Sequence, residues 1–341
     1  MVSTYQIMSA NNLVATVRDG VVTIIDDRLA PIFLKRTLNF EKWVTNRAID
    51  AVRPNSRVLK RAHGLSRLCP DFETALTYNA ACITDNFWVK KAGESWEDVR
   101  FDSDFYFKAA VSSDNSIFDV KPSKSPELTN IGSREKGWKL IDGEWWLYKN
   151  EPEQNMRFEL LTSRIGKLLG FDMAYYELSD GFIRTKDVTE GRYNLQHIDA
   201  IVFDHDGIVD EDLDYNYRTL MDISPDIASS HADMKYLDAL VNNVDRHTKN
   251  YALLTSQEDG RILKLAPNYD NDMAFYDFSA ILEADRDRGE MRAFLEFAGK
   301  IGYMPPELDE SELDAILEGC ERAEQIKAYL INGEKLVREQ A

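Results

Sequence analysis

The chain has 341 residues and a formal net charge of −18, and 44% of its residues are hydrophobic and 11% aromatic. This length and composition allow a sizeable buried core and exclude a disordered protein. The negative charge excludes non-specific attraction to nucleic-acid phosphates, so we expect no direct nucleic-acid binding.

The first hundred residues are predicted to mix strands and helices. Residues 21–27 (VVTIIDD) have the composition of a strand, and residues 39–52 carry apolar side chains at helical spacing up to Arg53 and Pro54. Residues 83–101 alternate enough to predict a strand and a turn, with their tryptophan pair in a core.

A hairpin and a long helix follow in the middle of the chain. Residues 136–140 and 144–148 flank a turn at Asp142-Gly143, which is a hairpin signal. Residues 155–171 have the spacing of an amphipathic helix that ends at Gly170. A strand-rich stretch comes next, and residues 197–210 are its most apolar run.

Helical patterns dominate after residue 220. One helix is expected to begin at Ser230, which has the spacing of a capping box with Asp233, and to run to residue 244. Two more helical stretches, 279–301 and 310–338, are separated by Gly302 and two prolines. Strands in the first half and helices in the second predict an α+β fold with two lobes.

Two polar segments stand on either side of a short predicted hairpin. NNVDRHTKN (242–250) holds Asp245 and, five positions later, Asn250, and KLAPNYDND (264–272) holds Asp270. The strands 251–255 and 261–266, joined by an Asp-Gly turn, return the chain to its starting point. The three side chains should therefore converge.

These three groups suit a magnesium and phosphate site. Carboxylate and amide oxygens are the ligands that Mg²⁺ prefers together with substrate phosphates, and a carboxylate that binds no metal can accept a hydroxyl proton. Protein kinases place an Asp, an Asn five positions later and a second Asp beyond a hairpin in this order, although HRD is VDR here and DFG is DND. The alternative is that these residues only build turns and caps. His247 and Lys249 are interpreted as supports of the loop, with Lys249 also a candidate phosphate contact.

The first half of the chain should then supply the nucleotide contacts. Lys149 closes the second hairpin strand and is the candidate phosphate-binding lysine, with Glu159 on the next helix to orient it. The alternative for Lys149 is a solvated lysine at a strand end. The cover over the phosphates would be residues 128–139, which contain no GxGxxG motif.

Four residues of this cover are candidates for phosphate chemistry. The backbone amides of Gly132 and Ser133 could cradle a phosphate ahead of the basic side chain of Lys136, and Thr129 and Ser133 could accept one. For the adenine, we expect Val202 and Phe203, with Ile201, to lie on a strand that links the lobes.

The chain resembles the HipA-like serine/threonine kinases, a bacterial group that includes toxin components of toxin–antitoxin pairs. The matching segments are the loop NIGSREK, the YKN that holds Lys149, the helix RFELLTSRIGKLLG, VFD at 202–204, NNVDRHTKN and LAPNYDND, which together span residues 128–275. The resemblance implies a bilobal protein-kinase-like fold with a strand-rich N-lobe and a helical C-lobe.

The resemblance also implies roles for the site residues. Asp245 would be the catalytic base, Asn250 and Asp270 the Mg²⁺ ligands, and Lys149 the contact to ATP phosphate. In the toxin kinases a serine just ahead of the loop glycine is autophosphorylated, and the aligned position here is Thr129, with Ser133 nearby. Several relatives work beside a small DNA-binding antitoxin, and an acidic chain would suit such a basic partner.

Residues 1–100 depart from the N-terminal part of the best-known HipA toxins, so toxicity and an antitoxin partner transfer less well than the kinase chemistry. We expect an accessory subdomain over 1–105, a kinase N-lobe over 106–204 and a C-lobe over 205–341. Residues Cys69, Cys82 and Cys320 are too far apart for a metal site and are interpreted as reduced thiols.

The start of the chain lacks a basic region followed by an apolar core, and no stretch approaches about 18 apolar residues, so we expect a cytoplasmic protein without a membrane segment. The leading hypothesis is an ATP- and Mg²⁺-dependent serine/threonine protein kinase. The alternatives are a kinase of small molecules or lipids, and a nucleotide-binding pseudokinase that serves as an interaction module.

Overall fold

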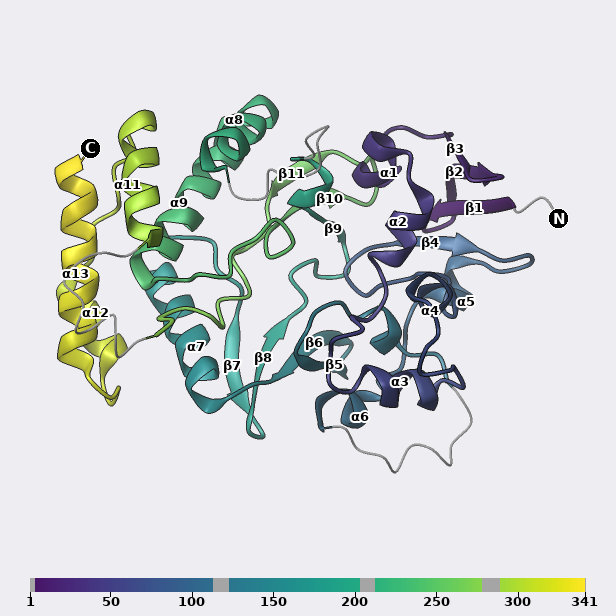
Figure 1. Ribbon diagram of the computed structural model, residues 1–341, viewed down its shortest axis with the longest axis horizontal. Coiled ribbons are helices and arrows are strands. Elements are labelled where there is room, and N and C mark those ends of the chain that lie inside the picture. The colour runs from purple at the N-terminus through teal and green to yellow at the C-terminus, as the bar shows by residue number, and fades with distance from the viewer. Residues whose placement is uncertain (1–3, 113–122, 203–211, 278–288, 341) are drawn as a thin grey trace. The chain divides into compact units, whose positions relative to one another are not determined.

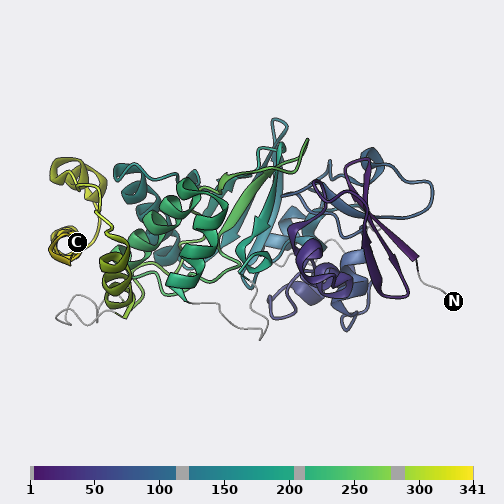
Figure 2. The ribbon, with the colours of Figure 1, turned by 90° about the horizontal axis from the view of Figure 1, so that it is seen from above.

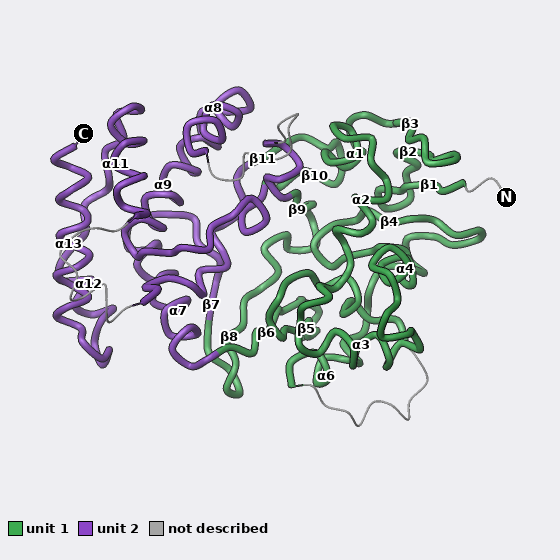
Figure 3. The backbone as a smooth tube through the Cα atoms, viewed as in Figure 1, with its two compact units in different colours: residues 1–151, 177–196, 253–263 green, residues 152–176, 197–252, 264–341 purple. Residues whose placement is uncertain are grey.

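A computed structural model describes residues 4–112, 123–202, 212–277 and 289–340 (Figure 1). The chain forms two compact units, each made of several segments (Figure 3). Unit 1 comprises residues 1–151, 177–196 and 253–263, and unit 2 comprises residues 152–176, 197–252 and 264–341. The expected subdomain boundaries at 105 and 204 stay a prediction. No helix among the described residues combines the length and the apolar character that crossing a membrane requires.

The first sheet of unit 1 is antiparallel and has the strand order β3-β2-β1-β4. Its strands are β1 (Thr4–Ser9), β2 (Asn12–Arg18), β3 (Val21–Ile24) and β4 (Phe87–Lys90). Trp88 is fully buried and packs with Trp96, as expected for this tryptophan pair. Short helices accompany the sheet: α1 (Ile32–Thr37), α2 (Phe40–Thr45), α3 (Ser56–Ala62), α4 (Asp71–Leu76) and α5 (Trp96–Val99).

The second sheet has the order β5-β6-β8-β7 and contains the predicted hairpin. Its strands are β5 (Glu135–Ile141), β6 (Glu144–Asn150), β7 (Tyr176–Ser179) and β8 (Phe182–Lys186), and α6 (Phe107–Ser112) packs against β5 and β6. Asp142 and Gly143 form the turn with φ of 51° and 84°, which confirms the Asp-Gly signal. A 3₁₀ turn, η2 (Pro126–Thr129), leads into β5.

The third sheet has the order β11-β10-β9. Its strands are β9 (Tyr193–His197), β10 (Ala252–Ser256) and β11 (Ile262–Leu265), so the hairpin predicted between the two polar segments is confirmed. After β9 the chain makes the 3₁₀ turn η3 (Ile198–Ala200). The strand expected across residues 201–203 is wrong at Ile201 and Val202, which continue this turn, and Phe203 lies outside the described residues.

Unit 2 is built mainly of helices, and those after residue 212 are green to yellow in Figures 1 and 2. Helix α9 contacts α7, α8, α11 and α13, so it is central to the packing. The core includes Ile165, Leu240 and Phe294, all at most 1% exposed. The helices are α7 (Glu153–Leu168), α8 (Leu213–Ile223), α9 (Pro225–Val241), α11 (Gly289–Ile301), α12 (Glu310–Leu317) and α13 (Ala323–Gln340).

Three helix predictions are wrong in where the helix begins, ends or breaks. The helix expected over 39–52 is only α2, which ends at Thr45; tighter turns follow, and the backbone N–H of Ile49 then donates to the carbonyl of Leu128. The helix expected to begin at Ser230 is α9, which begins at Pro225; Ser224 caps it, and the Ser224 hydroxyl accepts the N–H of Asp226. The stretch 310–338 is two helices separated at Gly319, whose φ is 75°. The α+β class, with strands mainly in unit 1 and helices mainly in unit 2, is confirmed.

Candidate active site

The polar loop 242–250 starts where α9 ends. Asn242 adopts a left-handed conformation with φ of 51°, which stops the helix. The loop then presents Asp245 at the surface and buries Asn250. The side-chain nitrogen of Asn250 donates to the carbonyl of Asp245 over 2.8 Å, and its N–H donates to the carbonyl of His247 over 2.8 Å. The amide oxygen of Asn250 is therefore the atom available to a cation.

His247 and Lys249 occupy the middle of this loop. The N–H of Lys249 donates to Nδ1 of His247 over 3.2 Å, and the Lys249 side chain is exposed. The ring and carbonyl of His247 thus support the loop locally. The phosphate contact of Lys249 stays a prediction.

Arg246 connects the two polar segments from inside unit 2. Its side chain is 2% exposed and forms an ion pair with Asp238 on α9, at 3.0 Å. One guanidinium nitrogen donates to the carbonyls of Asn250 (2.8 Å) and Tyr269 (2.6 Å). The other terminal nitrogen donates to the side-chain oxygen of Asn271 over 2.5 Å. The planar guanidinium has several N–H donors in fixed directions, so it can hold two loops in a fixed relative position, which a lysine ammonium cannot do.

Asp270 sits in the second segment with a left-handed backbone. Its φ is 61°, an unusual conformation that Asp tolerates better than most residues. The N–H of Asp270 donates to the hydroxyl of Tyr176 over 3.0 Å, and the N–H of Asn271 donates to the carboxylate of Glu159 over 3.3 Å. Buried Glu159 thereby fixes the backbone beside Asp270.

The carboxylates of Asp270 and Asp272 influence the pKa of Asp245. Partial burial raises the pKa of Asp245, the carboxylates of Asp272 and Asp270 raise it further, and His247 and Arg246 lower it. Asp272 is 8% exposed and was not predicted as a site residue. A carboxylate whose pKa is raised in this way is a better proton acceptor than an ordinary surface aspartate.

The residue types at positions 250 and 270 fit a magnesium ion that is bound together with phosphates. Among the described residues, no three His, Cys, Asp or Glu side chains gather as a protein cage for a metal. Mg²⁺ bound with nucleotide needs only one or two carboxylates, because waters and phosphates complete its shell. The oxygens of Asn250 and Asp270 are hard ligands of that kind.

Within unit 1, a pair of lysines lies on the β5–β6 hairpin. Lys136 and Lys149 are directly opposite each other in the register of β5 and β6, so their side chains share one face. On the opposite face Tyr148 packs on α6.

The loop that precedes β5 wraps around Lys136. Gly132 has φ of 119°, and a Cβ atom there would collide with the amine end of the Lys136 side chain. Ser133 is exposed, whereas Thr129 is 5% exposed and donates its hydroxyl to the carbonyl of Ala81 over 2.6 Å. In this conformation Ser133, and not Thr129, is accessible to a phosphate donor.

On the expectation that Lys136 binds a nucleotide phosphate, Gly132→Ala should weaken nucleotide binding by about tenfold or more, because the added methyl group would displace the Lys136 ammonium. The matched control is Gly143→Ala, which also has positive φ but open space around the added methyl group. Calorimetric titration with ATP measures both. Equal affinities in the two variants would contradict the role of the Gly132 loop.

The expected adenine contacts are only partly described. Val202 is 5% exposed, and its N–H already donates to the carbonyl of Ile198 over 3.0 Å. Its adenine contact stays a prediction.

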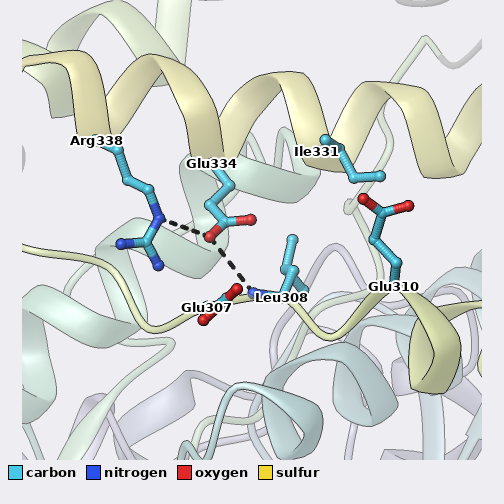
Figure 4. A pocket seen from close by; sticks show the side chains of 6 residues that line it. All are labelled: Glu307, Leu308, Glu310, Ile331, Glu334 and Arg338. Carbon is cyan, nitrogen blue, oxygen red and sulfur yellow. Dashed lines mark hydrogen bonds and ion pairs between the residues drawn. The ribbon is translucent and has the colours of Figure 1, made fainter.

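A pocket of about 380 Å³ lies elsewhere in unit 2, beside α13 (Figure 4). Glu334 there accepts bonds from Arg338 (2.7 Å) and from the N–H of Leu308 (3.4 Å). Its acidic lining disfavours a phosphate group, so it is not part of the candidate site. It is lined by Glu307, Leu308, Glu310, Ile331, Glu334 and Arg338.

No protein-family model matches the sequence, and no curated protein matches it. Solved structures do match. HipA of Shewanella oneidensis MR-1, in complex with HipB and its operator DNA, aligns with a TM-score of 0.55, covering 98% of this chain and 96% of that chain at 12% identity. The chain has a HipA-like kinase fold. The Helicobacter pylori proinflammatory kinase CtkA aligns with a TM-score of 0.42, covering 60% of this chain and 89% of that chain at 17% identity.

Sequence reasoning missed two residues of unit 2 in this HipA-like fold. Arg246 lies in the polar loop 242–250, yet it is buried because five acceptors surround its guanidinium. Asp272 ends the segment KLAPNYDND, and the kinase pattern assigns it no role. In the sequence, the position of Arg246 next to Asp245 could have indicated that it supports the site. The spacing of two residues between Asp270 and Asp272 could have indicated that Asp272 lies near the site.

Proposed function

We propose that this chain is a Mg²⁺-dependent kinase that transfers the γ-phosphate of ATP to the hydroxyl of a protein serine or threonine. Asp245 is the general base in this proposal, and Asn250 and Asp270 bind Mg²⁺. Lys149 and Lys136 bind the phosphates. The HipA-like fold supports the reaction class, and the residues support the division of roles.

The proposal also assigns roles to residues near these groups. The backbone of Gly132 and Ser133 cradles phosphate, and Lys249 adds a further phosphate contact. Glu159 fixes the backbone beside Asp270, and Val202 contacts adenine. Ser133 is the accessible candidate for autophosphorylation.

The observation that carries the proposal is the joining of the two polar segments by one buried side chain. Arg246 donates to the carbonyls of Asn250 and Tyr269, and so fixes the residues on either side of the hairpin β10–β11. The amide of Asn250 is in turn bonded to the backbone of Asp245.

The chain's own groups then act in a simple sequence. The carboxylate of Asp245 accepts the proton of the attacking hydroxyl, and its partial burial raises its basicity. The oxygens of Asn250 and Asp270 hold the cation, which when bound neutralises the charge on the transferring phosphate. Lys149 and Lys136 bind the phosphates from the hairpin.

The pH dependence of the reaction follows from the raised pKa of Asp245. The base works only when deprotonated, so the rate should rise with pH through its pKa. The acid limb should lie above the ordinary aspartate value of about 3.9. Initial rates between pH 4 and 8 measure this, with ATP saturating. A rate that is independent of pH on the acid side would contradict the role of Asp245.

The direct test is incubation of the purified chain with Mg-ATP and a lysate, followed by intact mass and phosphosite analysis. Phosphate on serine or threonine of the chain or of a lysate protein, absent with Asp245→Ala, is the expected result. Label found only on small hydroxylated metabolites would indicate a small-molecule kinase. ATP binding without any transfer would indicate a pseudokinase.

A partner and a location remain predictions. HipA of Shewanella oneidensis was solved with HipB and operator DNA, and the charge of −18 on the present chain suits a basic partner. We therefore propose a small DNA-binding, antitoxin-like protein as the partner. The cytoplasmic location rests on the sequence alone.

A further inference from the structure

The loop of residues 130–136 has an exposed tip and buried ends. Ile131, Ser133 and Arg134 are exposed, whereas Asn130 is 5% exposed. The side chain of Asn130 also bridges the loop by donating to the carbonyl of Lys136 over 3.3 Å. The two ends of the loop are therefore held close together.

The groups that hold these ends come from the N-terminal region, residues 1–105. The side chain of Arg53 is buried and donates to the carbonyl of Asn130 over 3.2 Å and to the carbonyl of Lys136. It also donates to the carbonyl of Ala110 (3.2 Å) and to the side chain of Asn55 (2.9 Å). One guanidinium thus contacts both ends of the 130–136 loop.

The segment just before the loop is anchored by the same region. The N–H of Ile49 donates to the carbonyl of Leu128 over 2.7 Å, and Thr129 donates its hydroxyl to the carbonyl of Ala81 over 2.6 Å. All of these contacts lie within unit 1. The N-terminal region therefore fixes the loop by its main chain as well as by Arg53.

A buried carboxylate completes the arrangement. Glu127 is fully buried, and its oxygens accept the N–H of Trp138 (2.9 Å) and the side-chain amide of Asn130 (3.2 Å). Burial raises the pKa of Glu127 to about 7, while Arg53 lowers it and Asp104 raises it. Its contacts again join the start of the loop to the strand that follows it.

We infer that the N-terminal region is a clamp for the 130–136 loop, and that Arg53 is the positioning residue that fixes both of its ends. This assigns a task to the accessory part of the chain. That the clamped loop binds nucleotide rests on the proposed function, but the clamp itself does not.

The test compares two buried arginines of the same region. Arg53→Met removes the clamp. Arg47→Met is the matched control, since Arg47 is also buried and ion-paired, to Asp85 at 2.7 Å, and bonds to Ala80 and Phe87 but not to the loop. Both variants lose a buried charge in the N-terminal region, so a general loss of stability affects both.

Limited trypsin digestion with mass analysis measures how firmly the 130–136 loop is held, because Arg134 is an exposed cleavage site in this loop. We expect cleavage after Arg134 to be about tenfold faster in Arg53→Met than in the wild type or Arg47→Met. If Arg53→Met does not fold, Arg53→Lys, which keeps the charge but cannot reach both carbonyls with a fork, should show the same change. Equal cleavage rates would overturn the clamp.

Binding of a fluorescent ATP analogue is the second readout. Arg53→Met should weaken it by about tenfold, with Arg47→Met close to the wild type. If the wild-type chain binds no nucleotide, the proposed function fails, while the digestion still decides on the clamp. Faster cleavage with unchanged nucleotide affinity would overturn the positioning role of Arg53.

Discussion

Asp245→Asn should lower the rate of phosphoryl transfer by about 10²–10⁴-fold, the usual contribution of a general base. Asparagine cannot accept the hydroxyl proton, although it has the shape of aspartate. Since Asn250 bonds to the main-chain carbonyl of residue 245 and not to its side chain, the loop should keep its geometry. Single-turnover measurements with saturating Mg-ATP separate the rate of transfer from nucleotide binding.

The folded state should tolerate this change. The pKa of Asp245 is raised in the fold, so at neutral pH the ionised carboxylate is less favourable there than in the unfolded chain. Removing the charge should therefore leave the melting temperature unchanged or raise it. Asp222→Asn, at the exposed end of α8, is the control and should transfer phosphate at the wild-type rate. A large drop in the melting temperature of Asp245→Asn would mean that its lost activity reflects unfolding.

Arg246→Met should destabilise unit 2 by about 3–5 kcal/mol, because it leaves the buried carboxylate of Asp238 without its partner. Transfer should also be lost, since the carbonyls of Asn250 and Tyr269 no longer share a donor. Thermal and urea unfolding measure the first effect, and activity at low temperature measures the second.

A double variant distinguishes stability from positioning. In Asp238→Leu/Arg246→Met both buried charges are gone, so most of the lost stability should return. The two loops still lack the guanidinium, so activity should stay low. A stable and fully active double variant would show that Arg246 acts only as the partner of Asp238.

The sequence predicted well the parts of the fold that local patterns encode. The hairpin around Asp142-Gly143, the helix α7 and the hairpin β10–β11 follow from turn chemistry and apolar spacing within about twenty residues. The start of α9 was misplaced because two serines offer a cap, and the one followed by proline, Ser224, is the one used.

Long-range contacts were beyond such patterns. Nothing local to Arg246 shows that Asn268 and Asn271, more than twenty positions away, are its acceptors. Residues 39–52 have helical spacing, yet the helix ends at Thr45, and the N–H of Ile49 donates to the carbonyl of Leu128 in a distant turn. In both cases the hydrogen-bond acceptors come from distant parts of the sequence, and only the fold brings them near the donor.

The magnesium dependence of ATP binding in Asp270→Asn and Asp245→Asn tests the separation of roles most directly. Asp270 is assigned to the metal and Asp245 to the proton, so calorimetric titrations with and without Mg²⁺ should differ between the two variants. We predict that Asp245→Asn keeps the magnesium-dependent gain in ATP affinity and that Asp270→Asn loses it. Loss of that gain in both variants, or in neither, would contradict the assignment.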